Sequence, residues 1–489
     1  MRCYATILSS MSDVHLDDIV SLCKRRGFIY QGSDVYGGLS GTWDYGPLGV
    51  QLKRNIMNLW WKMFVDERDD MYGVDAAILM NQKVWQASGH VDTFTDPLVE
   101  CSNCKGRFRA DKLDNPNKCP SCGKEGTFGE AKQFNMMFTT NIGPVASDQT
   151  ANILNYIQKI HVDDLISNDV NEKTKEWMMS ISEKAADVSK ERNDSRVYLR
   201  PETAQGIFTN YKNVVDSFYP DLPFGIAQQG KAFRNEISPR DFVFRSREFE
   251  QMEIEYFIHP DSWEQMFEGW IIGIRMFLTE SLGLPAEMIH ELEVGENDRA
   301  HYSKRTIDFE FDFPIGREEL MGLAYRTDFD LMNIQNNSGK SMEYRVKGSD
   351  EKFVPHVIEP SFGVERALMA VLTAAYREDE QNGEKRVYLA LPEHLAPVKY
   401  AVSPLLKNKP ELVEKAREVY AKLSKENPGR VMWDDNGNIG KRYRRQDEIG
   451  TPYCVVIDFQ TLEDGTVTVR NIDTTEQARV EIGSLKTTG

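Results

Sequence analysis

The sequence lacks an apolar run long enough to cross a membrane, which takes about 20 residues in a helix. Its most apolar stretch, WIIGIRMFL at 270–278, is interrupted by Arg275, and the N-terminal MRCYATILSSMSDV has only a short apolar run. A secretory signal needs a longer apolar core than this. We therefore expect a cytoplasmic protein that does not bind membranes.

The common phosphate-binding signatures are also missing. The sequence has no GxxxxGK[ST] loop and no GxGxxG dinucleotide motif. A bound nucleotide would therefore have to be held by side chains, chiefly arginines, built on a sheet. No Ser-His-Asp or Cys-His arrangement stands out either, which disfavours a reaction through a covalent enzyme intermediate.

Positive charge is in short supply, because 59 Lys and Arg residues face 76 Asp and Glu residues, for a formal net charge of −17. Such a protein repels nucleic acid at long range, so a nucleic-acid partner would be held by local basic patches. The segment IGKRYRRQDEIG contains one candidate patch: Lys441, Arg442, Arg444 and Arg445. These residues either contact phosphates or form a solvated helix face.

Cysteine is scarce, with seven in 489 residues, and an odd total without a secretion signal favours a reducing compartment. Four of them form two CxxC pairs separated by fourteen residues: Cys101, Cys104, Cys119 and Cys122. Four thiolates at this spacing suit one tetrahedral Zn²⁺, and they leave no position for water, so the ion would be structural. Redox pairs or reduced structural cysteines are the alternative.

A chain of this length suggests two to four domains of about 150 residues each. A polar connector, AAYREDEQNGEKR, separates 12–386 from 387–489, where strands and helices alternate as in a small α/β domain. Within the first region, 95–130 holds the CxxC pairs and 146–195 is predicted to be a polar helical insertion. Pro47 is predicted to begin a helix whose apolar face is either core or a subunit interface.

The most densely charged segment is KAFRNEISPRDFVFRSREFEQMEIEYF, residues 231–257. The turn chemistry of SPRD predicts a hairpin with strands at 232–237 and 243–257. Alternation along the second strand places a polar set on one face and an apolar set on the other. The polar set is Arg245, Arg247, Phe249, Gln251 and Glu253, and the apolar set is Met252, Ile254 and Tyr256.

Two further polar clusters, LRPETAQG at 199–206 and VIEPSFGVERALMAVL at 357–372, accompany this hairpin. Arginines bind phosphates, an aromatic face suits a base, and carboxylates suit an ammonium group or a metal. The combination indicates a site for a nucleotide and an amine. A solvated sheet with cross-strand ion pairs is the alternative.

These residues resemble the signature motifs of class II aminoacyl-tRNA synthetases: the GP helix start at Gly46, FRNE at 233–236 and GVER at 363–366. The blocks SGHVDTFTDP, RPETAQGIF, FRNEISPRD, FEQMEIEYF and EPSFGVER are similar to the dimeric type of glycyl-tRNA synthetase, over roughly 16–473. The resemblance implies an α+β catalytic domain on an antiparallel sheet at 12–386, with a zinc-ribbon-like and a helical insertion. It further implies a C-terminal anticodon-binding α/β domain and a homodimer.

The implied reaction has two steps. Glycine and ATP, with Mg²⁺, form glycyl-adenylate and pyrophosphate, and the glycyl group then passes to the 3′ end of tRNA(Gly). By the same resemblance Arg234 contacts the α-phosphate, Arg366 contacts the γ-phosphate, and Phe249 stacks on adenine. Arg234, Glu236 and Arg366 are the implied catalytic residues.

The resemblance assigns two sets of contacts. The ATP set is Arg234, Asn235, Glu236, Phe244, Arg245, Ser246, Arg247, Glu248, Phe249, Glu319, Leu320, Gly363, Val364, Glu365 and Arg366. The glycine set is Arg109, Glu202, Phe249, Glu250, Gln251, Met252, Glu253, Arg326, Glu359, Pro360, Ser361, Phe362 and Gly363. The clustered acids Glu202, Glu253 and Glu359 are expected to have raised pKa values until an ammonium group binds.

Three other hypotheses fit the sequence less well. A non-catalytic synthetase relative that binds nucleic acid would be expected to lose the ATP arginines, yet Arg234 and Arg366 are present. A ligase that activates an amino acid without tRNA would not need the C-terminal domain. A zinc-ribbon binding module would explain only the segment around the CxxC pairs.

Overall fold

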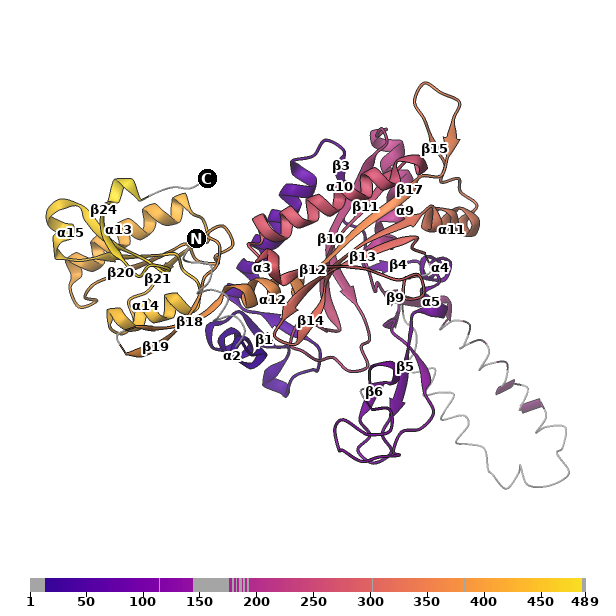
Figure 1. Ribbon diagram of the computed structural model, residues 1–489, viewed down its shortest axis with the longest axis horizontal. Coiled ribbons are helices and arrows are strands. Elements are labelled where there is room, and N and C mark those ends of the chain that lie inside the picture. Colours follow the sequence, from indigo (N-terminus) through magenta and orange to yellow (C-terminus); the bar gives the residue numbers. More distant parts are fainter. Residues whose placement is uncertain are drawn as a thin grey trace. The chain divides into compact units, whose positions relative to one another are not determined.

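The computed structural model describes residues 14–113, 115–143, 193–300, 302–381 and 383–485, with scattered residues between 176 and 190. Most of the predicted insertion at 146–195 lies outside the described residues. Figure 1 draws the chain as a ribbon with its helices and strands labelled. The chain divides into two compact units. Unit 1 comprises Met1–Ala76, Gly206–Lys231 and Ser238–Gly489, and unit 2 comprises Ala77–Gln205 and Ala232–Ile237. Among the described helices, none combines the length and the apolar character that a membrane span requires.

A seven-stranded sheet forms the centre of unit 1. Its strand order is β12 (Ile289–Glu293), β13 (Arg305–Phe313), β14 (Gly316–Thr327), β17 (His356–Gly363), β11 (Glu248–Ile258), β10 (Phe224–Phe233) and β3 (Met71–Gly73). The pairings from β12 to β11 are antiparallel, and β3 runs parallel to β10 at the edge. This confirms the expected class II α+β architecture.

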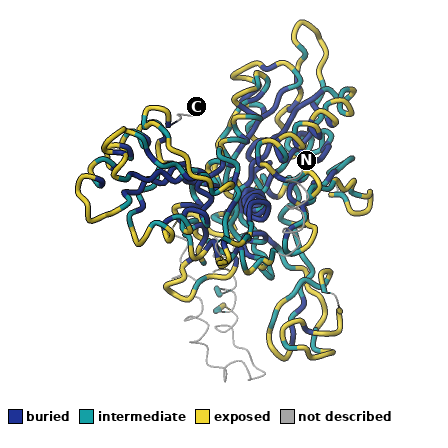
Figure 2. Tube along the Cα trace, turned by 60° about the vertical axis from the view of Figure 1, so that its left-hand side comes forward, coloured by how far each residue is buried: buried dark blue, intermediate teal, exposed yellow. Residues whose placement is uncertain are grey.

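One face of this sheet packs against three helices: α3 (Pro47–Trp61), α10 (Trp263–Met276) and α12 (Val364–Ala375). Helix α3 begins at Pro47 as predicted, after Gly46 in an extended conformation. Every residue of α12 except Arg366 is buried. Figure 2 shows the buried residues, in dark blue, gathered in the interior and the exposed residues, in yellow, at the periphery. The predicted apolar set of β11 is confirmed, because Met252 and Ile254 lie fully buried in this core.

The opposite face of the sheet is covered at one end by α9 (Ala204–Phe218), whose Tyr211 ring lies 4.6 Å from the ring of Phe257. Odd-numbered residues of β11 belong to this face. The alternation therefore leaves polar side chains of β11 on the face that is not filled by α3, α10 and α12.

The predicted hairpin is longer and less regular than expected. Strand β10 ends at Phe233 and β11 begins at Glu248, so the segment between them, predicted to be mostly strand, is a loop. Asp241 and Phe242 have φ values of 61° and 57°, which a strand cannot accommodate. At the end of the loop, the Arg247 amide donates a 2.7 Å hydrogen bond to the Gly41 carbonyl, so this amide is not available for pairing with a neighbouring strand.

Unit 2 contains two three-stranded sheets. Their strands are β4 (Leu79–Met80), β9 (Arg196–Leu199) and β8 (Thr139–Asn141) in one, and β6 (Arg107–Arg109), β5 (Thr95–Glu100) and β7 (Lys132–Asn135) in the other. The short helices α4 (Gln82–Ala87) and α5 (His90–Thr93) belong to the same unit. The cysteine pairs lie beside β5 and β6, as a zinc-ribbon-like segment requires.

The C-terminal part has the predicted alternation of strands and helices. Its sheet order is β21 (Val431–Trp433), β20 (Tyr400–Pro404), β22 (Tyr453–Ile457), β23 (Thr466–Asn471) and β24 (Gln477–Glu481), with helices α13 (Pro410–Glu426), α14 (Ile439–Glu448) and α15 (Phe459–Asp464). The proposed boundary at 387 falls inside β19 (Glu384–Leu389), which pairs with β18 (Tyr376–Gln381). The remaining elements are α2 (Leu16–Arg26), β1 (Ile29–Gln31), β2 (Trp43–Tyr45), α11 (Phe329–Ser338), β15 (Tyr344–Arg345) and β16 (Lys352–Phe353).

The basic cluster on α14 is divided between internal contacts and solvent, because Lys441 and Arg444 are exposed whereas Arg442 and Arg445 have partners within the domain. Arg442 is buried, and its guanidinium donates to the carbonyl oxygens of Asp435 and Gly437 at 3.1 and 2.9 Å. Arg445 pairs with Asp434 at 2.6 Å. The guanidinium groups of Arg442 and Arg445 are therefore engaged in contacts within the domain and are not free to bind phosphates.

The packing of α3 generates a first prediction. A Cβ atom at Gly49 would lie 1.9 Å from the Phe28 carbonyl oxygen, so Gly49→Ala should lower the free energy of unfolding by about 1–3 kcal/mol or more. The matched control is Gly269→Ala in α10, where a Cβ meets nothing within 4 Å. That change should stabilise the protein by about 0.5–1 kcal/mol. Denaturant unfolding compares both variants, and equal effects would contradict this packing.

Candidate active site

Three neighbouring strands of unit 1 bring predicted glycine-site residues together. Register pairs Glu253 of β11 with Ser361 of β17, and Glu359 of β17 with Ala324 of β14. The Ser361 hydroxyl donates a 2.7 Å hydrogen bond to Glu253 Oε1. The strands thus fix these side chains through backbone pairing as well as through their own contact.

Arg326 organises the acidic side chains of this region. Its Nε and Nη2 donate to the two oxygens of Asp330 at 2.7 and 2.9 Å, and its Nη1 donates to Glu359. The guanidinium also lies 3.8 Å from the Tyr302 ring centroid. Arg326, Asp330, Glu359 and Glu253 are all more than nine-tenths buried. The buried carboxylates outnumber the one guanidinium, so the region has a capacity for a further cation.

A second cluster in unit 1 gathers predicted ATP residues. Arg366, the one residue of α12 that is not buried, pairs with a Glu319 carboxylate oxygen at 3.0 Å. Its guanidinium lies 4.5 Å from the Phe244 ring centroid. The Arg366 side chain is 25% exposed and that of Glu319 is 47% exposed. This arginine is therefore held in place but accessible to an anion.

In unit 2 the predicted residues are positioned by a different set of contacts. Arg234 Nε donates to the Pro201 carbonyl at 3.1 Å, and its guanidinium lies 5.5 Å from the Phe94 ring centroid. Glu202 lies 3.3 Å from His90 Nε2. The structure therefore fixes Arg234 next to the RPETAQG segment, within the same unit.

Arg109, a predicted substrate contact, pairs with Asp96 at 2.9 Å and with Asp111 at 2.7 Å. The Asp111 hydrogen bond, together with both carboxylates, raises the pKa of Arg109. Its charge is thereby neutralised locally in this structure.

The four clustered cysteines fit a metal ion. Their Sγ atoms all lie within 4.8 Å of one another, with Cys101–Cys122 at 3.8 Å and Cys104–Cys119 at 3.6 Å. Sulfurs about 2.3 Å from a tetrahedral Zn²⁺ would be about 3.8 Å apart. The observed separations match that geometry and are far longer than the roughly 2.05 Å of a disulfide.

Comparison with known proteins identifies the family. Residues 186–375 match the tRNA synthetase class II core domain (G, H, P, S and T), and residues 399–488 match an anticodon binding domain. Glycine–tRNA ligases of Borrelia garinii and Clostridium acetobutylicum are each 43% identical to the chain. The matches cover 96% of this chain and 96% and 97% of those proteins, respectively. The ligase of Borreliella burgdorferi is 44% identical over 96% of both chains.

The chain belongs to the glycine–tRNA ligase family. Membership confirms the resemblance drawn from the sequence motifs, including the class II core and the C-terminal domain. It also makes the protein an aminoacyl-tRNA ligase.

Several predicted contact residues point away from these clusters. Met252, Leu320, Phe362 and Val364 are buried in the apolar core, so only their backbone atoms remain as candidates. Glu250 forms an ion pair with Lys53 of α3, on the core side of β11. Period-two alternation explains the result for Glu250, Met252 and Phe362, because these positions are the even-numbered neighbours of Gln251 and Glu253 or of Ser361.

Some site residues were missed in the sequence. Asp330 lies four residues after Arg326, in α11 rather than in β14, and neither the spacing nor its residue type showed that the two would pair. His90 is contained in the quoted SGHVDTFTDP block, yet it had no assigned role. Glu255 continues the polar face of β11 two residues after Glu253, so alternation alone would have placed it on the site face.

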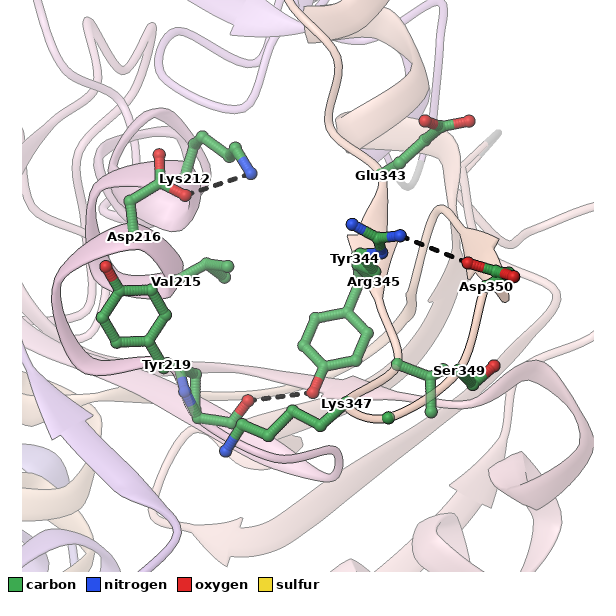
Figure 3. Close-up of a pocket in the computed structure, with 13 residues that line it drawn as sticks. Lys212, Val215, Asp216, Tyr219, Glu343, Tyr344, Arg345, Lys347, Ser349 and Asp350 are labelled. Carbon is green, nitrogen blue, oxygen red and sulfur yellow. Dashed lines mark hydrogen bonds and ion pairs between the residues drawn. The ribbon is translucent and has the colours of Figure 1, made fainter.

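A separate hollow of unit 1 is not part of this chemistry. It lies between the end of α9 and the segment 343–350, has a volume of about 710 Å³, and contains none of the predicted site residues. Figure 3 shows its charged side chains pairing with one another, as in Lys212 with Asp216 and Arg345 with Asp350.

Glu365 connects the synthetase motifs of unit 1. Its buried carboxyl accepts hydrogen bonds from the Tyr45 hydroxyl of β2, at 3.1 Å, and from the Glu250 amide of β11, at 2.9 Å. Burial raises the pKa of Glu365 from its ordinary 4.5 to about 7. The folded state therefore holds more protons than the unfolded state between these pH values.

The sign of this linkage gives a second prediction. The contribution of Glu365 to stability is present below pH 4.5 and is lost as pH rises through 7. Glu365→Gln should remove this loss, which amounts to about 3 kcal/mol at most. Denaturant unfolding at about pH 5 and about pH 8 measures the slope. The exposed Glu287→Gln is the control, and parallel pH profiles for wild type and Glu365→Gln would refute the assignment.

Proposed function

We propose that the protein activates glycine with ATP and then transfers the glycyl group to tRNA(Gly). The observation that supports this most directly is the buried acids Glu253 and Glu359, with the Ser361 hydroxyl on Glu253 and Arg326 on Glu359, in a member of the glycine–tRNA ligase family. In that cluster an ammonium group finds fixed carboxylates and a hydroxyl. The residue sets implied by the motifs are proposed as the ATP and glycine contacts.

Activation requires positioning and charge neutralisation more than covalent help. The glycine carboxylate attacks the α-phosphorus in line, and pyrophosphate leaves with the bonding electrons. We assign Arg234 to the α-phosphate and Arg366 to the γ-phosphate. Mg²⁺ would neutralise phosphate charge when it is bound. The oxygen ligands that it prefers are present near Arg366, where Glu319 and Asp308 would hold it.

The electrostatics around Asp308 support that assignment. Burial, followed by the neighbouring charges of Glu319 and Glu310, raises the pKa of Asp308 to about 6. Carboxylates that repel one another in this way gain stability when a divalent cation is shared between them.

Selectivity for glycine follows from a tightly packed pocket. Every competing amino acid is larger, and forcing an extra methyl group into close packing costs about 1–3 kcal/mol. We assign Arg326 to the orientation of Glu359 rather than to the substrate carboxylate, because each of its nitrogens already donates to Asp330 or Glu359. The ammonium then pairs with carboxylates whose positions are fixed.

The domain at 399–488 supports tRNA as the second substrate. With a net charge of −17, the protein needs local contacts to hold tRNA. The buried Arg442 of α14 is a poor candidate for those contacts, whereas Lys441 and Arg444 are exposed. A homodimer in the cytoplasm is proposed on the family resemblance.

Amino-acid-dependent ATP–pyrophosphate exchange without tRNA tests the first step. Glycine should support exchange, and alanine and serine should be at least about tenfold poorer in kcat/KM, because the pocket cannot fit the added atoms. Arg366→Ala should lower exchange about 10²–10³-fold by removing a fixed positive charge.

Arg317→Ala is the matched control, because Arg317 also lies on the surface beside β14 but pairs only with Asp312 in the contacts described. Its rate should stay within about twofold of wild type. A folded, zinc-replete protein with no exchange for any of the three amino acids would favour a non-catalytic tRNA-binding subunit.

We also propose that the cysteine cluster holds a structural Zn²⁺. Four thiolates fill the tetrahedral shell and leave no site for water, so this ion would brace the segment around β5 and β6 rather than take part in catalysis.

Metal analysis of the purified protein checks this proposal. Wild type should contain about one zinc per chain, and Cys104→Ser should lose most of it together with thermal stability. Ser102→Ala, an exposed change between the first pair of ligands, should retain the metal. A wild-type protein that folds without zinc, and whose thermal stability does not change when a chelator is added, would contradict the proposal of a structural zinc ion.

A further inference from the structure

Glu255 is the most buried carboxyl on the site face of β11. Its side chain has no solvent exposure, whereas Glu253 and Gln251 on the same face are 2% and 7% exposed. Neither of its carboxyl oxygens has a hydrogen-bond partner among the described residues. A buried acid without partners needs a physical explanation, because an unpaired ionised carboxylate is costly to bury.

The charged groups that face Glu255 come from four elements. They are Glu253 on β11 itself, Glu359 on β17, Arg326 on β14 and Asp330 on α11. The Arg326 nitrogens donate to Asp330 and Glu359, and no hydrogen bond from the guanidinium reaches Glu255 among the described residues.

Gln228 is the second unpartnered group on this face. A Cβ built on Gly225 of β10 would meet the Tyr256 ring at 3.0 Å, so odd positions of β10 share the core face with even positions of β11. Gln228 therefore shares the site face with Glu255, and it too is fully buried without a hydrogen-bond partner among the described residues. The adjacent strand thus supplies a neutral amide rather than a cation.

The charge balance decides the state of Glu255. If all four carboxyls were ionised, one guanidinium would face four negative charges in a region with little solvent exposure, and an incoming ammonium would still leave two in excess. One proton on the cluster reduces that excess. Glu255 is the member with neither a hydrogen bond nor solvent, so the proton costs least there. Burial, reinforced by Glu359, raises the pKa of Glu255 well above its ordinary range.

We propose that Glu255 is a positioning residue of the glycine site that stays protonated and neutral beneath Glu253 and Glu359. Its buried side chain packs on the same face of the sheet without adding charge. Glu253 and Glu359 therefore remain the anionic partners of the substrate ammonium. The inference rests on the proposed glycine site. Its tests by stability and spectroscopy need no catalytic turnover, so they can fail or succeed independently of the exchange assay.

The pH dependence of stability distinguishes a neutral from an ionised Glu255. A folded pKa above the unfolded value makes wild type lose stability relative to Glu255→Gln as pH rises. The unfolding midpoint of the variant, minus that of wild type, should therefore increase from about pH 5 to about pH 8. An ionised Glu255 gives the opposite sign, with Glu255→Gln most destabilising at high pH, and that result would overturn the proposal.

Infrared spectroscopy observes the proton directly. Wild type near neutral pH should show a protonated carboxylic acid carbonyl band that Glu255→Gln lacks and Glu365→Gln retains. In the exchange assay, Glu255→Gln should raise the glycine KM at most about threefold, against about tenfold or more for Glu253→Gln, which loses a charged partner. Equal effects of the two variants, or no lost band, would contradict a neutral Glu255.

Folding of the variant is itself informative. If Glu255→Gln does not fold, Glu255→Met provides a neutral side chain of similar length. Its unfolding midpoint is then compared with that of wild type at the same two pH values. Failure of both neutral replacements would count against the proposal, because a site that holds a neutral acid should accept at least one neutral substitute.

Discussion

The buried guanidinium of Arg326 is the interaction on which the site of unit 1 depends. It neutralises Asp330 from α11 and Glu359 from β17, and so allows two carboxylates to remain in a region with almost no solvent exposure. Breaking such a pair by removing one partner costs about 3–5 kcal/mol, because the other charge is left buried and unpaired. The positions of Glu359 and of its neighbour Ser361 are therefore fixed before any substrate arrives.

The antiparallel sheet makes this arrangement possible. Along β11 and β17, alternate side chains enter the apolar core beneath α3 and α12, and the intervening ones form the charged face. Packing of Met252 and Phe362 on the core side sets the register, and a slip of one residue would bury Glu253 in that core. The stability of the fold and the placement of the acidic cluster are consequences of the same register.

Local signals in the sequence predicted the parts of the site that depend on local structure. Pro47 predicted the start of α3, the alternation in FEQMEIEYF predicted the two faces of β11, and the CxxC spacing predicted the cysteine cluster. The loop before β11 could not be predicted in this way, because the positive φ values of Asp241 and Phe242 accompany a hydrogen bond to Gly41, about 200 positions away in the sequence. Long-range contacts of that kind leave no local pattern.

Arg442 shows the same limit for charges. A run of basic residues in the sequence does not show which guanidinium will be buried against carbonyl groups and which will face solvent. Raised carboxyl pKa values were expected for the acids of the glycine motifs. Burial also raises the pKa of Glu255, which lies on the same face of β11 but was not among those acids.

Two arginines of unit 1 illustrate how one residue type serves two purposes. The pair between Arg366 and Glu319 is partly exposed, and such pairs are worth about 0–1 kcal/mol, so a phosphate can replace the carboxylate at little cost. The pair between Arg326 and Asp330 is buried and cannot be exchanged without leaving an uncompensated charge. Exposure therefore separates the guanidinium that is available to a ligand from the one that shapes the pocket. The same reasoning explains how a protein without a glycine-rich phosphate loop can bind a nucleotide on a sheet.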